Sequence, residues 1–569
     1  MTDSPEDLSV DYDVIVVGAG ISGLTAAREL KKMDPSIRIL ILEAKDRVGG
    51  RTHSVELKGA HYSKVTLDLG GQWVGRTQRN ILRLLDELGL KTYDQYSEGA
   101  KVAQISTSAP RKYNTALPIH SIRQFSLFEI VDTVATLTKL DWLTKRITAP
   151  NWFSSKKAVI LDEMTVSKWG KENCWTRASL DALDISVRSV YGVEPNRMSM
   201  LYNVVVCKSA GGFMNLVECI GEGAQAMRVA GGTQQISIKM LENLEKDTVK
   251  LGQAVSAIDV DESSLITTIY TYDVDTKDEA SYTCRHVICA IPPHLCGQIR
   301  FSPTLPELKR RLFSSCPQGN LVKFLITYET AFWRENGLSG EIISTGRTVT
   351  PGEVLPIIAT YDATTDMGIP ALVGFINEEF CDLPLSERCN AVVTDLSRFL
   401  GDDAFKQFID YKDKIWAHEP FNGGCPNAFV PPGQMDAYQV IRDPFHNVHF
   451  AGTESATEWI GYMDGAVQSG WRAAHEVLKC MEKDRLICYN YLKGTIYDNE
   501  YEKPSPPSNH YDETRSPWWR RIFFTSALIF GIYAYSKKYQ LSMAAKAVKP
   551  VENRLIKWFF DIEWPGSEL

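Results

Sequence analysis

Apolar and polar positions near the start of the chain follow one another in the order strand, helix, strand. Residues 14–17 form an apolar run typical of a buried parallel strand, and a helix is predicted over residues 24–32, ending before Asp34 and Pro35. A second apolar run covers residues 37–42 and ends at Glu43. The pattern predicts a βαβ unit with a short turn after its first strand.

Three glycines mark that turn. Gly18, Gly20 and Gly23 form a G-x-G-x-x-G motif directly after the predicted strand, and Glu43 follows Gly18 by 25 positions. In such a unit the first glycine permits the tight turn, the second lets the backbone approach a pyrophosphate, and the third lets the helix pack on the strand. The pyrophosphate then binds at the helix N-terminus and the acidic residue binds ribose hydroxyls. This context predicts a dinucleotide site.

The rest of the chain shows a coarser order of elements. Residues 79–220 are mostly helical in pattern, whereas residues 301–420 alternate strands and helices. Shorter strands are expected at residues 249–258, 264–274, 286–293 and 445–453. A helix is expected near the end of this part of the chain, at residues 465–481. One glycine pair, at residues 49–50, directly precedes Arg51. A second pair, at residues 70–71, directly precedes Gln72 and Trp73. Both pairs let backbone pass close to a flat or phosphorylated ligand, and Arg51 offers charge to a phosphate.

Composition narrows the class of protein. The chain has 569 residues, which suggests roughly three to four domain-sized units. Its 44% hydrophobic content supports a large core, and its net charge of −8 excludes general nucleic-acid binding. The twelve cysteines include no C-x-x-C pair, so free thiols in a reducing compartment are expected, and no metal site is predicted.

The C-terminal part differs from the rest. Residues 491–517 are polar and rich in proline, which indicates a linker. An uncharged run follows at residues 522–535, flanked by Trp518, Trp519 and basic residues, and residues 515–569 carry nine Lys or Arg against four Asp or Glu. Counting the aromatic and basic flanks, the run is long enough to anchor the chain in a membrane.

Four motifs together carry a family resemblance. The glycine motif at 18–23, RVGGRT at 47–52, AGTE at 451–454 and WIGYMDGA at 459–466 resemble the flavin-containing amine oxidases, and within them the monoamine oxidase group. The resemblance covers about residues 11–485. It implies an α/β fold with a Rossmann-like FAD-binding domain assembled from discontinuous segments, an α+β substrate domain, and a C-terminal membrane-anchoring helix.

The resemblance also implies domain boundaries and cofactor contacts. The FAD-binding domain takes residues 11–90, 221–300 and 425–485, and the substrate domain takes 91–220 and 301–424; a linker (486–517) and the anchor with its tail (518–569) follow. The implied FAD-binding residues are Gly18, Gly20, Gly23, Glu43, Arg51, Gly70, Gly71, Gln72, Trp73, Val255, Trp416, Cys425, Gly452, Thr453 and Met463.

Two residues are implied in catalysis. Lys323 matches the lysine that holds a water near flavin N5, although a strand-edge lysine pointing to solvent is the alternative. Tyr462 matches one wall of an aromatic cage in front of the flavin. The family has a second tyrosine where this chain has Pro426, so either another aromatic such as Phe429 compensates or the substrate spectrum differs. Leu216, Val217 and Gln225 match residues of the substrate cavity.

Cys425 matches the residue that attaches the flavin 8α-methyl through a thioether in monoamine oxidases, whereas some related oxidases bind FAD without a covalent link. The implied activity is oxidation of primary or secondary arylalkyl or biogenic amines by oxygen to aldehyde, ammonia and peroxide. A polyamine oxidase, an L-amino-acid oxidase and a non-enzymatic, flavin-stabilised membrane scaffold are the alternatives. The tail resembles those of the mitochondrial outer membrane, with the catalytic part in the cytosol; the endoplasmic reticulum is the alternative, and a homodimer is a family expectation.

Overall fold

The predicted βαβ unit is present at the start of the fold. It consists of β1 (Tyr12–Val17), α1 (Ile21–Met33) and β2 (Ile39–Leu42), with β1 and β2 parallel. The computed structural model describes residues 9–105, 109–113, 126–147, 156–347 and 352–498. These residues belong to one compact unit.

β1 and β2 lie in a large mixed sheet. Its strand order is β10-β2-β1-β13-β12-β11-β14, and β20 pairs with β13. The further strands are β10 (Val249–Lys250), β11 (Gln253–Val260), β12 (Thr267–Asp273), β13 (Glu279–Cys289), β14 (Arg300–Ser302) and β20 (Val448–Phe450). The predicted strands of this part of the chain are thereby confirmed. Both faces of the sheet are covered, so alternate residues of β1 belong to different apolar clusters. Ile15 and Val17 belong to one cluster, and Val14 and Val16 belong to the other.

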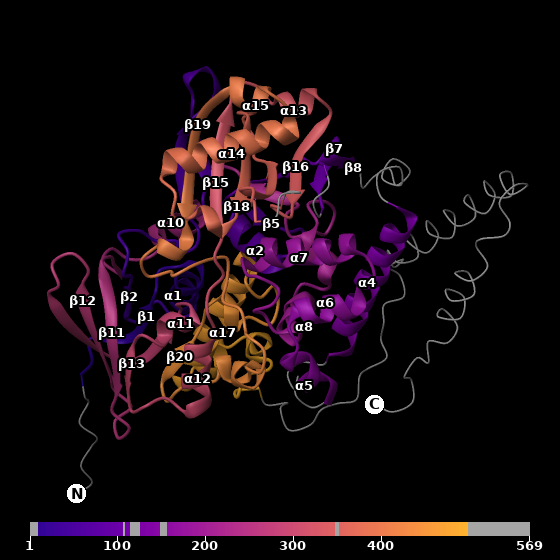
Figure 1. Ribbon diagram of the computed structural model, residues 1–569. Coiled ribbons are helices and arrows are strands. Elements are labelled where there is room, and N and C mark those ends of the chain that lie inside the picture. Colours follow the sequence, from indigo (N-terminus) through magenta and orange to yellow (C-terminus); the bar gives the residue numbers. More distant parts are fainter. Residues whose placement is uncertain (1–8, 106–108, 114–125, 148–155, 348–351, 499–569) are drawn as a thin grey trace, which may run out of the picture. The chain divides into compact units, whose positions relative to one another are not determined.

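Helices cover the face on which α1 lies. They are α2 (Arg79–Glu87), α10 (Gln234–Glu242) and α17 (Met463–Cys480), the last confirming the helix predicted near the end of the described chain. α1 and α17 pack closely: a Cβ on Gly470 would lie 2.4 Å from the carbonyl oxygen of Ser22. The two helices therefore share one interface above β1, and Figure 1 shows both beside the strands of this sheet.

A second sheet stands at the top of Figure 1. Its order is β19-β15-β18-β17-β16-β7-β8. The strands are β7 (Ala100–Gln104), β8 (Arg111–Tyr113), β15 (Val322–Tyr328), β16 (Leu338–Ser344), β17 (Ile357–Asp362), β18 (Ala371–Ile376) and β19 (Phe408–Ile415). β15 lies between β18 and β19, and all seven of its residues are buried.

The described part of residues 79–220 is mostly helical, as predicted, but three short strands at residues 92–94, 100–104 and 111–113 interrupt the helices and were not predicted. β7 pairs in parallel with β16, more than two hundred residues later in the chain, and such long-range pairing leaves little trace in the local pattern. Small sheets add β3 (Ser54–Lys58) with β4 (Lys64–Asp68), and β5 (Trp73–Val74) and β6 (Thr92–Asp94) with β9 (Met227–Val229).

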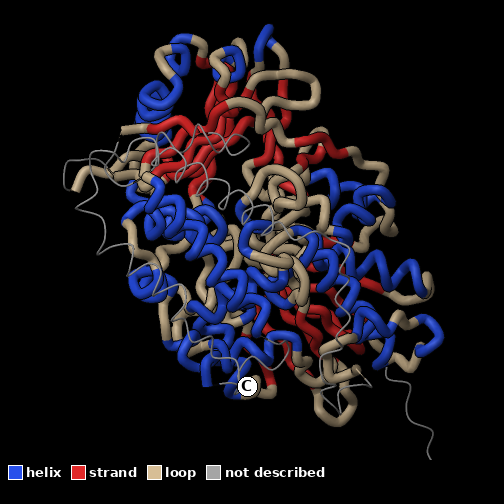
Figure 2. The backbone as a smooth tube through the Cα atoms, turned by 90° about the vertical axis from the view of Figure 1, so that its right-hand side faces the viewer, coloured by secondary structure: helices blue, strands red, loops and turns tan. Residues whose placement is uncertain are grey.

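The remaining α-helices form three groups. Figure 2 shows the strands gathered in two regions, with helices between and around them. The first group is α4 (Leu127–Arg146), α5 (Lys156–Glu163), α6 (Val166–Asn173), α7 (Arg177–Tyr191), α8 (Met200–Ser209) and α9 (Phe213–Val217). The second is α11 (Pro293–Cys296), α12 (Glu307–Ser315) and α16 (Met435–Tyr438), in which α12 packs on the other two. The third is α13 (Phe332–Glu335), α14 (Leu385–Leu400) and α15 (Asp403–Lys406), which lie against the second sheet.

The predicted membrane anchor, residues 518–569, lies outside the described residues, as does most of the predicted linker. None of the helices within residues 9–498 combines the length and apolar character needed to cross a bilayer. The boundaries assigned to the FAD-binding and substrate domains stay a prediction.

Candidate cofactor and active-site cavity

One large cavity of about 690 Å³ connects the βαβ turn with the second sheet. It brings together residues from distant parts of the sequence, and among them is every predicted site residue except Gly23. They are Gly18, Gly20, Glu43, Arg51, Gly70, Gly71, Gln72, Trp73, Leu216, Val217, Gln225, Val255, Lys323, Trp416, Cys425, Pro426, Gly452, Thr453, Tyr462 and Met463.

The three glycines of the turn have three different surroundings. Gly18 adopts φ +101°, where a side chain is strained, and a Cβ on Gly23 would lie 2.0 Å from the carbonyl oxygen of Gly18. Gly23 therefore lets α1 approach the turn and does not face the cavity. A Cβ on Gly20 would meet no protein atom within 4 Å. The space in front of Gly20 is part of the cavity, as a bound pyrophosphate requires.

Glu43 stands at the end of β2 and faces the same cavity. Its Oε2 accepts a hydrogen bond from the backbone N–H of Ala19 (2.7 Å), and its Oε1 accepts one from Lys45 (3.0 Å). Burial raises the pKa of this carboxyl, although both backbone donors oppose the shift. Since a carboxylate offers about four acceptor positions, it can also bind ribose hydroxyls.

Arg51 is paired within the protein. Its guanidinium donates to both carboxylate oxygens of Glu454, at 2.5 and 3.0 Å, and to the carbonyl oxygen of Pro426 at 3.0 Å. Burial opposes ionisation of Glu454, but the charge of Arg51 outweighs it and lowers the pKa of Glu454. Glu454, which the sequence interpretation did not single out, also accepts from the N–H of Ala428 at 3.2 Å. The pair therefore positions the loop that holds Cys425 and Pro426.

Lys323 is the second residue of β15 and is buried, so the solvent-facing alternative is wrong. Its Nζ donates to the carbonyl oxygen of Gly70 at 2.7 Å and to Oε1 of Gln72 at 2.6 Å. Burial lowers the pKa of Lys323 to about 7. An ammonium group that is half neutral at neutral pH can hold a water molecule or exchange a proton at the cavity wall.

Cys425 presents its thiol to the cavity, 3.8 Å from the carbonyl oxygen of Leu321. Burial raises the pKa of this thiol to about 12. Pro426 follows it on the cavity wall. Phe429 is buried but does not line the cavity, so it cannot supply the missing aromatic wall, and that part of the expectation was wrong.

Another aromatic side chain is available. Tyr361, on β17, lines the cavity that also contains Tyr462, and its ring packs edge-on against Trp73 with centroids 5.1 Å apart. The sequence interpretation missed Tyr361 because no motif surrounds it. The ring of Tyr462 is held from its own loop by Trp459, at 5.2 Å.

Charged side chains also reach the cavity. Lys101 on β7 and Glu341 on β16 form an ion pair of 2.8 Å across the strand pair, and both are largely buried. Glu218, directly after α9, lines the same cavity, and its carboxylate receives no hydrogen bond from the described residues. Burial raises the pKa of Glu218. These three residues lack any sequence motif, since they come from three elements that only the fold brings together.

Three buried polar atoms in the cavity wall lack partners among the described residues: Oγ of Ser189 and, on two amide side chains, Nε2 of Gln72 and Oε1 of Gln225. Buried polar groups are rarely left unpaired, so these atoms point to a ligand. Together with the open space at Gly20, the turn after β1 and the carboxylate of Glu43, they fit a long dinucleotide such as FAD.

Comparison with known proteins agrees with this site. Residues 21–478 match the family described as flavin containing amine oxidoreductase. The chain is 35% identical over 516 residues to a flavin-containing amine oxidase of Danio rerio, covering 90% of this chain and 92% of that protein. It is 34% identical over 491 residues to flavin-containing amine oxidase A of Canis lupus familiaris, covering 83% and 87%. A solved structure of a putrescine oxidase double mutant aligns with TM-score 0.73 and 30% identity, covering 82% of this chain and 99% of that one.

Proposed function

The chain belongs to the flavin-containing amine oxidoreductase family, and from that premise we propose that it oxidises arylalkyl monoamines to aldehydes. As a member of this family it is an FAD-dependent enzyme that oxidises amines. The proposal rests on one observation. Lys323, Cys425 and Tyr462 line the same cavity as the glycine turn after β1 and Glu43. The scaffold alternative would not need a buried lysine there.

The bound flavin supplies the two-electron chemistry, by which an amine is oxidised and oxygen is reduced. The chain supplies binding and charge. Gly18 permits the tight turn, the open space in front of Gly20 would hold the pyrophosphate, and Glu43 would bind the ribose. Lys323, held by Gly70 and Gln72, places a titratable amine where oxygen and water approach.

The substrate amine must lose its proton before oxidation, and a desolvated cavity favours the neutral form. Oε1 of Gln225 is free to accept from the amine N–H, because its Nε2 donates to the carbonyl oxygen of Leu216 at 2.9 Å. Leu216, Val217 and Tyr361 provide apolar surface for an aryl group. These contacts support a monoamine with an apolar tail.

We further propose that Cys425 forms a thioether to the flavin 8α-methyl: the S–C bond would replace the thiol S–H bond and one methyl C–H bond, and oxygen would take up the two electrons and two protons as peroxide. The support is the position of its thiol on the cavity wall, on a loop held to residues 319–321 by the backbone hydrogen bond from Cys425 to Gly319 (2.9 Å). Because burial raises the pKa of this thiol, bond formation needs the flavin in place and does not follow from a reactive free thiolate.

A diamine is the second candidate substrate, and Glu218 favours it. A polyamine oxidase needs acidic residues along the cavity to bind the additional ammonium groups of its substrate. Glu341 is already paired with Lys101, whereas the carboxylate of Glu218 can bind the second ammonium group of a diamine. An L-amino acid is disfavoured. Among the described cavity residues, the only arginine is Arg51, whose guanidinium already binds Glu454.

We propose that residues 518–569 anchor the enzyme in the mitochondrial outer membrane with the catalytic part facing the cytosol, and that the enzyme forms homodimers. The support for the anchor is the sequence alone: an apolar run with tryptophans and basic residues at its ends. Deletion of residues 517–569 should release the enzyme into the soluble fraction; persistent membrane association would contradict the anchor.

A peroxide assay with phenethylamine, tyramine, putrescine, spermine and an L-amino acid tests the substrate class. We expect the two arylalkyl amines to give the highest kcat/KM. Preference for putrescine or spermine would support the second candidate, and absence of peroxide from all five would favour the scaffold.

A further inference from the structure

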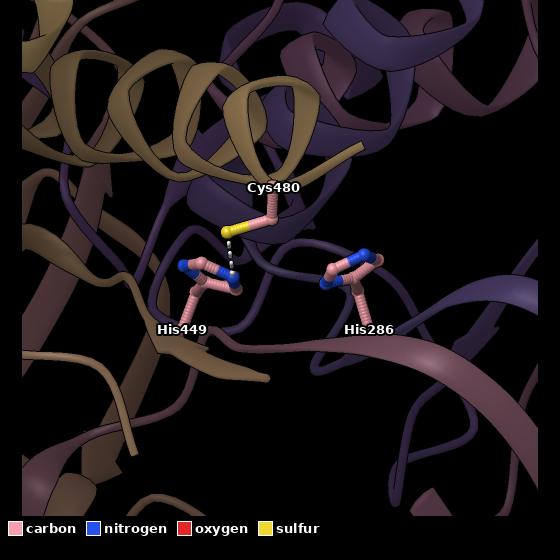
Figure 3. A group of neighbouring side chains, drawn as sticks. All are labelled: His286, His449 and Cys480. Atoms are coloured by element: carbon pink, nitrogen blue, oxygen red, sulfur yellow. Dashed lines mark hydrogen bonds between the residues drawn. The ribbon is translucent and has the colours of Figure 1, made fainter. Parts of the chain in front are cut away.

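A second cluster of reactive side chains lies outside the cavity, at the far end of α17. It consists of His286, His449 and Cys480, which Figure 3 shows with their polar atoms turned toward one another. One donor atom from each residue lies within 4.8 Å of the others, and Sγ of Cys480 is 4.0 Å from Nε2 of His449. None of the three lines the cavity described above.

The fold places the two imidazoles on one face of the large sheet. β13 and β20 are parallel, and His449 stands opposite Ile288, which is two residues from His286. Because alternate residues of a strand share a face, the two histidines are diagonal neighbours on the same side. Cys480 is the last residue of α17 and reaches this face from the helix end.

A carboxylate orients His449. Oε2 of Glu476 lies 3.1 Å from Nδ1 of His449, and Oε1 of the same residue accepts from Arg472 at 2.6 Å. Since an ionised carboxylate can only accept, Nδ1 carries a proton, and Nε2, which faces Cys480, is the ring nitrogen that can bind a metal once it has released its own proton. A carboxylate behind a histidine is the usual outer partner of a metal-bound imidazole.

His286 adds an independent observation. Its Nδ1 is buried and has no hydrogen-bond partner among the described residues. Figure 3 shows a ring nitrogen of His286 facing His449. A buried nitrogen without a partner is unfavourable unless a ligand satisfies it. Two imidazole nitrogens and a thiol converging on one point are the donor types that zinc prefers.

We propose that His286, His449 and Cys480 bind one zinc ion, with water as the fourth ligand on the exposed side of Cys480. In a tetrahedral zinc site, donor atoms lie roughly 3.5 Å apart, so the three donors, now within 4.8 Å of one another, must move closer by up to about 1 Å. Sγ of Cys480, which also lies 3.3 Å from the Tyr497 hydroxyl, would turn toward the two imidazoles. On binding, the thiol loses its proton to solvent and the sulfur bonds to zinc, with no change in oxidation state.

The position of the ion indicates a structural role. It would join the C-terminal end of α17 to β13 and β20, whereas Met463 at the other end of the helix faces the cavity. The two ends of this 18-residue helix lie about 25 Å apart. Zinc should therefore stabilise the fold without taking part in amine oxidation. This proposal does not depend on the substrate assigned above.

Zinc binding by the FAD-loaded, untagged full chain tests the proposal. After treatment with EDTA and desalting, the protein should take up one zinc per chain against a chromophoric competitor, and its Tm should rise. Co²⁺ in place of zinc should give a thiolate-to-metal charge-transfer band. Cys480→Ser should remove that band and weaken zinc binding at least about 100-fold, beyond what loss of an outer partner costs. The exposed Cys488→Ser is the matched control and should leave both unchanged.

His286→Asn provides a second variant, since this side chain is only partly buried, and it should weaken zinc binding as Cys480→Ser does. Failure to bind one equivalent of zinc would overturn the proposal. Zinc binding that survives both substitutions would also overturn it. Oxidation of Cys480 by peroxide at a rate that zinc does not change would overturn it too, and would indicate a redox-active thiol instead.

Discussion

Nζ of Lys323 lies 2.6 Å from Oε1 of Gln72, although 251 positions separate the two residues in the sequence. The contact connects β15, the second strand from one edge of the second sheet, to the loop after β4, and it fixes the amine at the cavity wall beside the predicted flavin end.

Lys323→Met should slow reoxidation of the reduced enzyme by oxygen about 100-fold, because a positive charge at the site of oxygen reduction is lost. The pKa of Lys323 is about 7, so the fraction of charged lysine falls as pH rises through 7. In the unsubstituted enzyme, the reoxidation rate measured by stopped flow should fall across that range, whereas the variant should show a low rate at every pH. The exposed Lys412→Met is the control; equal rates in Lys323→Met and the unsubstituted enzyme would disprove the role.

Cys425→Ala should abolish covalent attachment of the flavin. Acid precipitation of the unsubstituted enzyme should give a yellow pellet, and the same treatment of the variant should give a colourless pellet and free FAD. The exposed Cys488→Ser should behave like the unsubstituted enzyme. A colourless pellet from the unsubstituted enzyme would show that FAD binds without a covalent link.

Glu218→Gln should separate the two substrate classes. A charged hydrogen bond to a second ammonium is worth about 1.5–3 kcal/mol, so kcat/KM for putrescine should fall roughly tenfold or more while that for phenethylamine changes less than about twofold. Glu222→Gln, an exposed carboxylate four residues later, is the matched control. An equal loss for both substrates would assign Glu218 a structural role.

Glu454→Gln should lower the free energy of unfolding at pH 7 by about 3–5 kcal/mol, because it leaves the charge of Arg51 without its partner. The pKa of Glu454 is lower in the folded protein than its ordinary value of 4.5. The ion pair therefore contributes fully above pH 4.5 and loses its contribution as pH falls through the lowered pKa. Urea unfolding should show a difference between variant and unsubstituted enzyme that shrinks below pH 4.5; a constant difference would point to packing.

Gly20→Ala and Gly23→Ala should fail in different ways. At Gly20 the new methyl group meets no protein atom but enters the space for the pyrophosphate, so the apoprotein should keep its Tm while FAD binding weakens by about 1–3 kcal/mol. At Gly23 the methyl group would lie 2.0 Å from the carbonyl oxygen of Gly18, so the apoprotein itself should lose stability. Thermal unfolding without FAD and FAD titration distinguish the two; identical behaviour would contradict these separate roles.

The sequence was sufficient to predict the dinucleotide half of this protein. Its first apolar runs, the glycine motif and Glu43 lie within thirty residues, and their geometry depends on short-range backbone rules that the local pattern contains. The motifs at residues 451–466 then indicated the family, and every residue taken from the resemblance except Gly23 lines the cavity.

Only the tertiary structure showed what the charged and polar residues do. The sequence suggested that Arg51 binds a phosphate, but in the fold its guanidinium pairs with Glu454. The sequence also suggested that Phe429 could face the flavin, but in the fold this ring does not line the cavity. Glu218, Lys101 and Glu341, like His286, His449 and Cys480, come from elements far apart in the chain. Hydrophobic periodicity and turn chemistry act over a few residues, so the sequence alone determines such elements; a cavity or an ion pair depends on which elements pack together, which the three-dimensional fold decides.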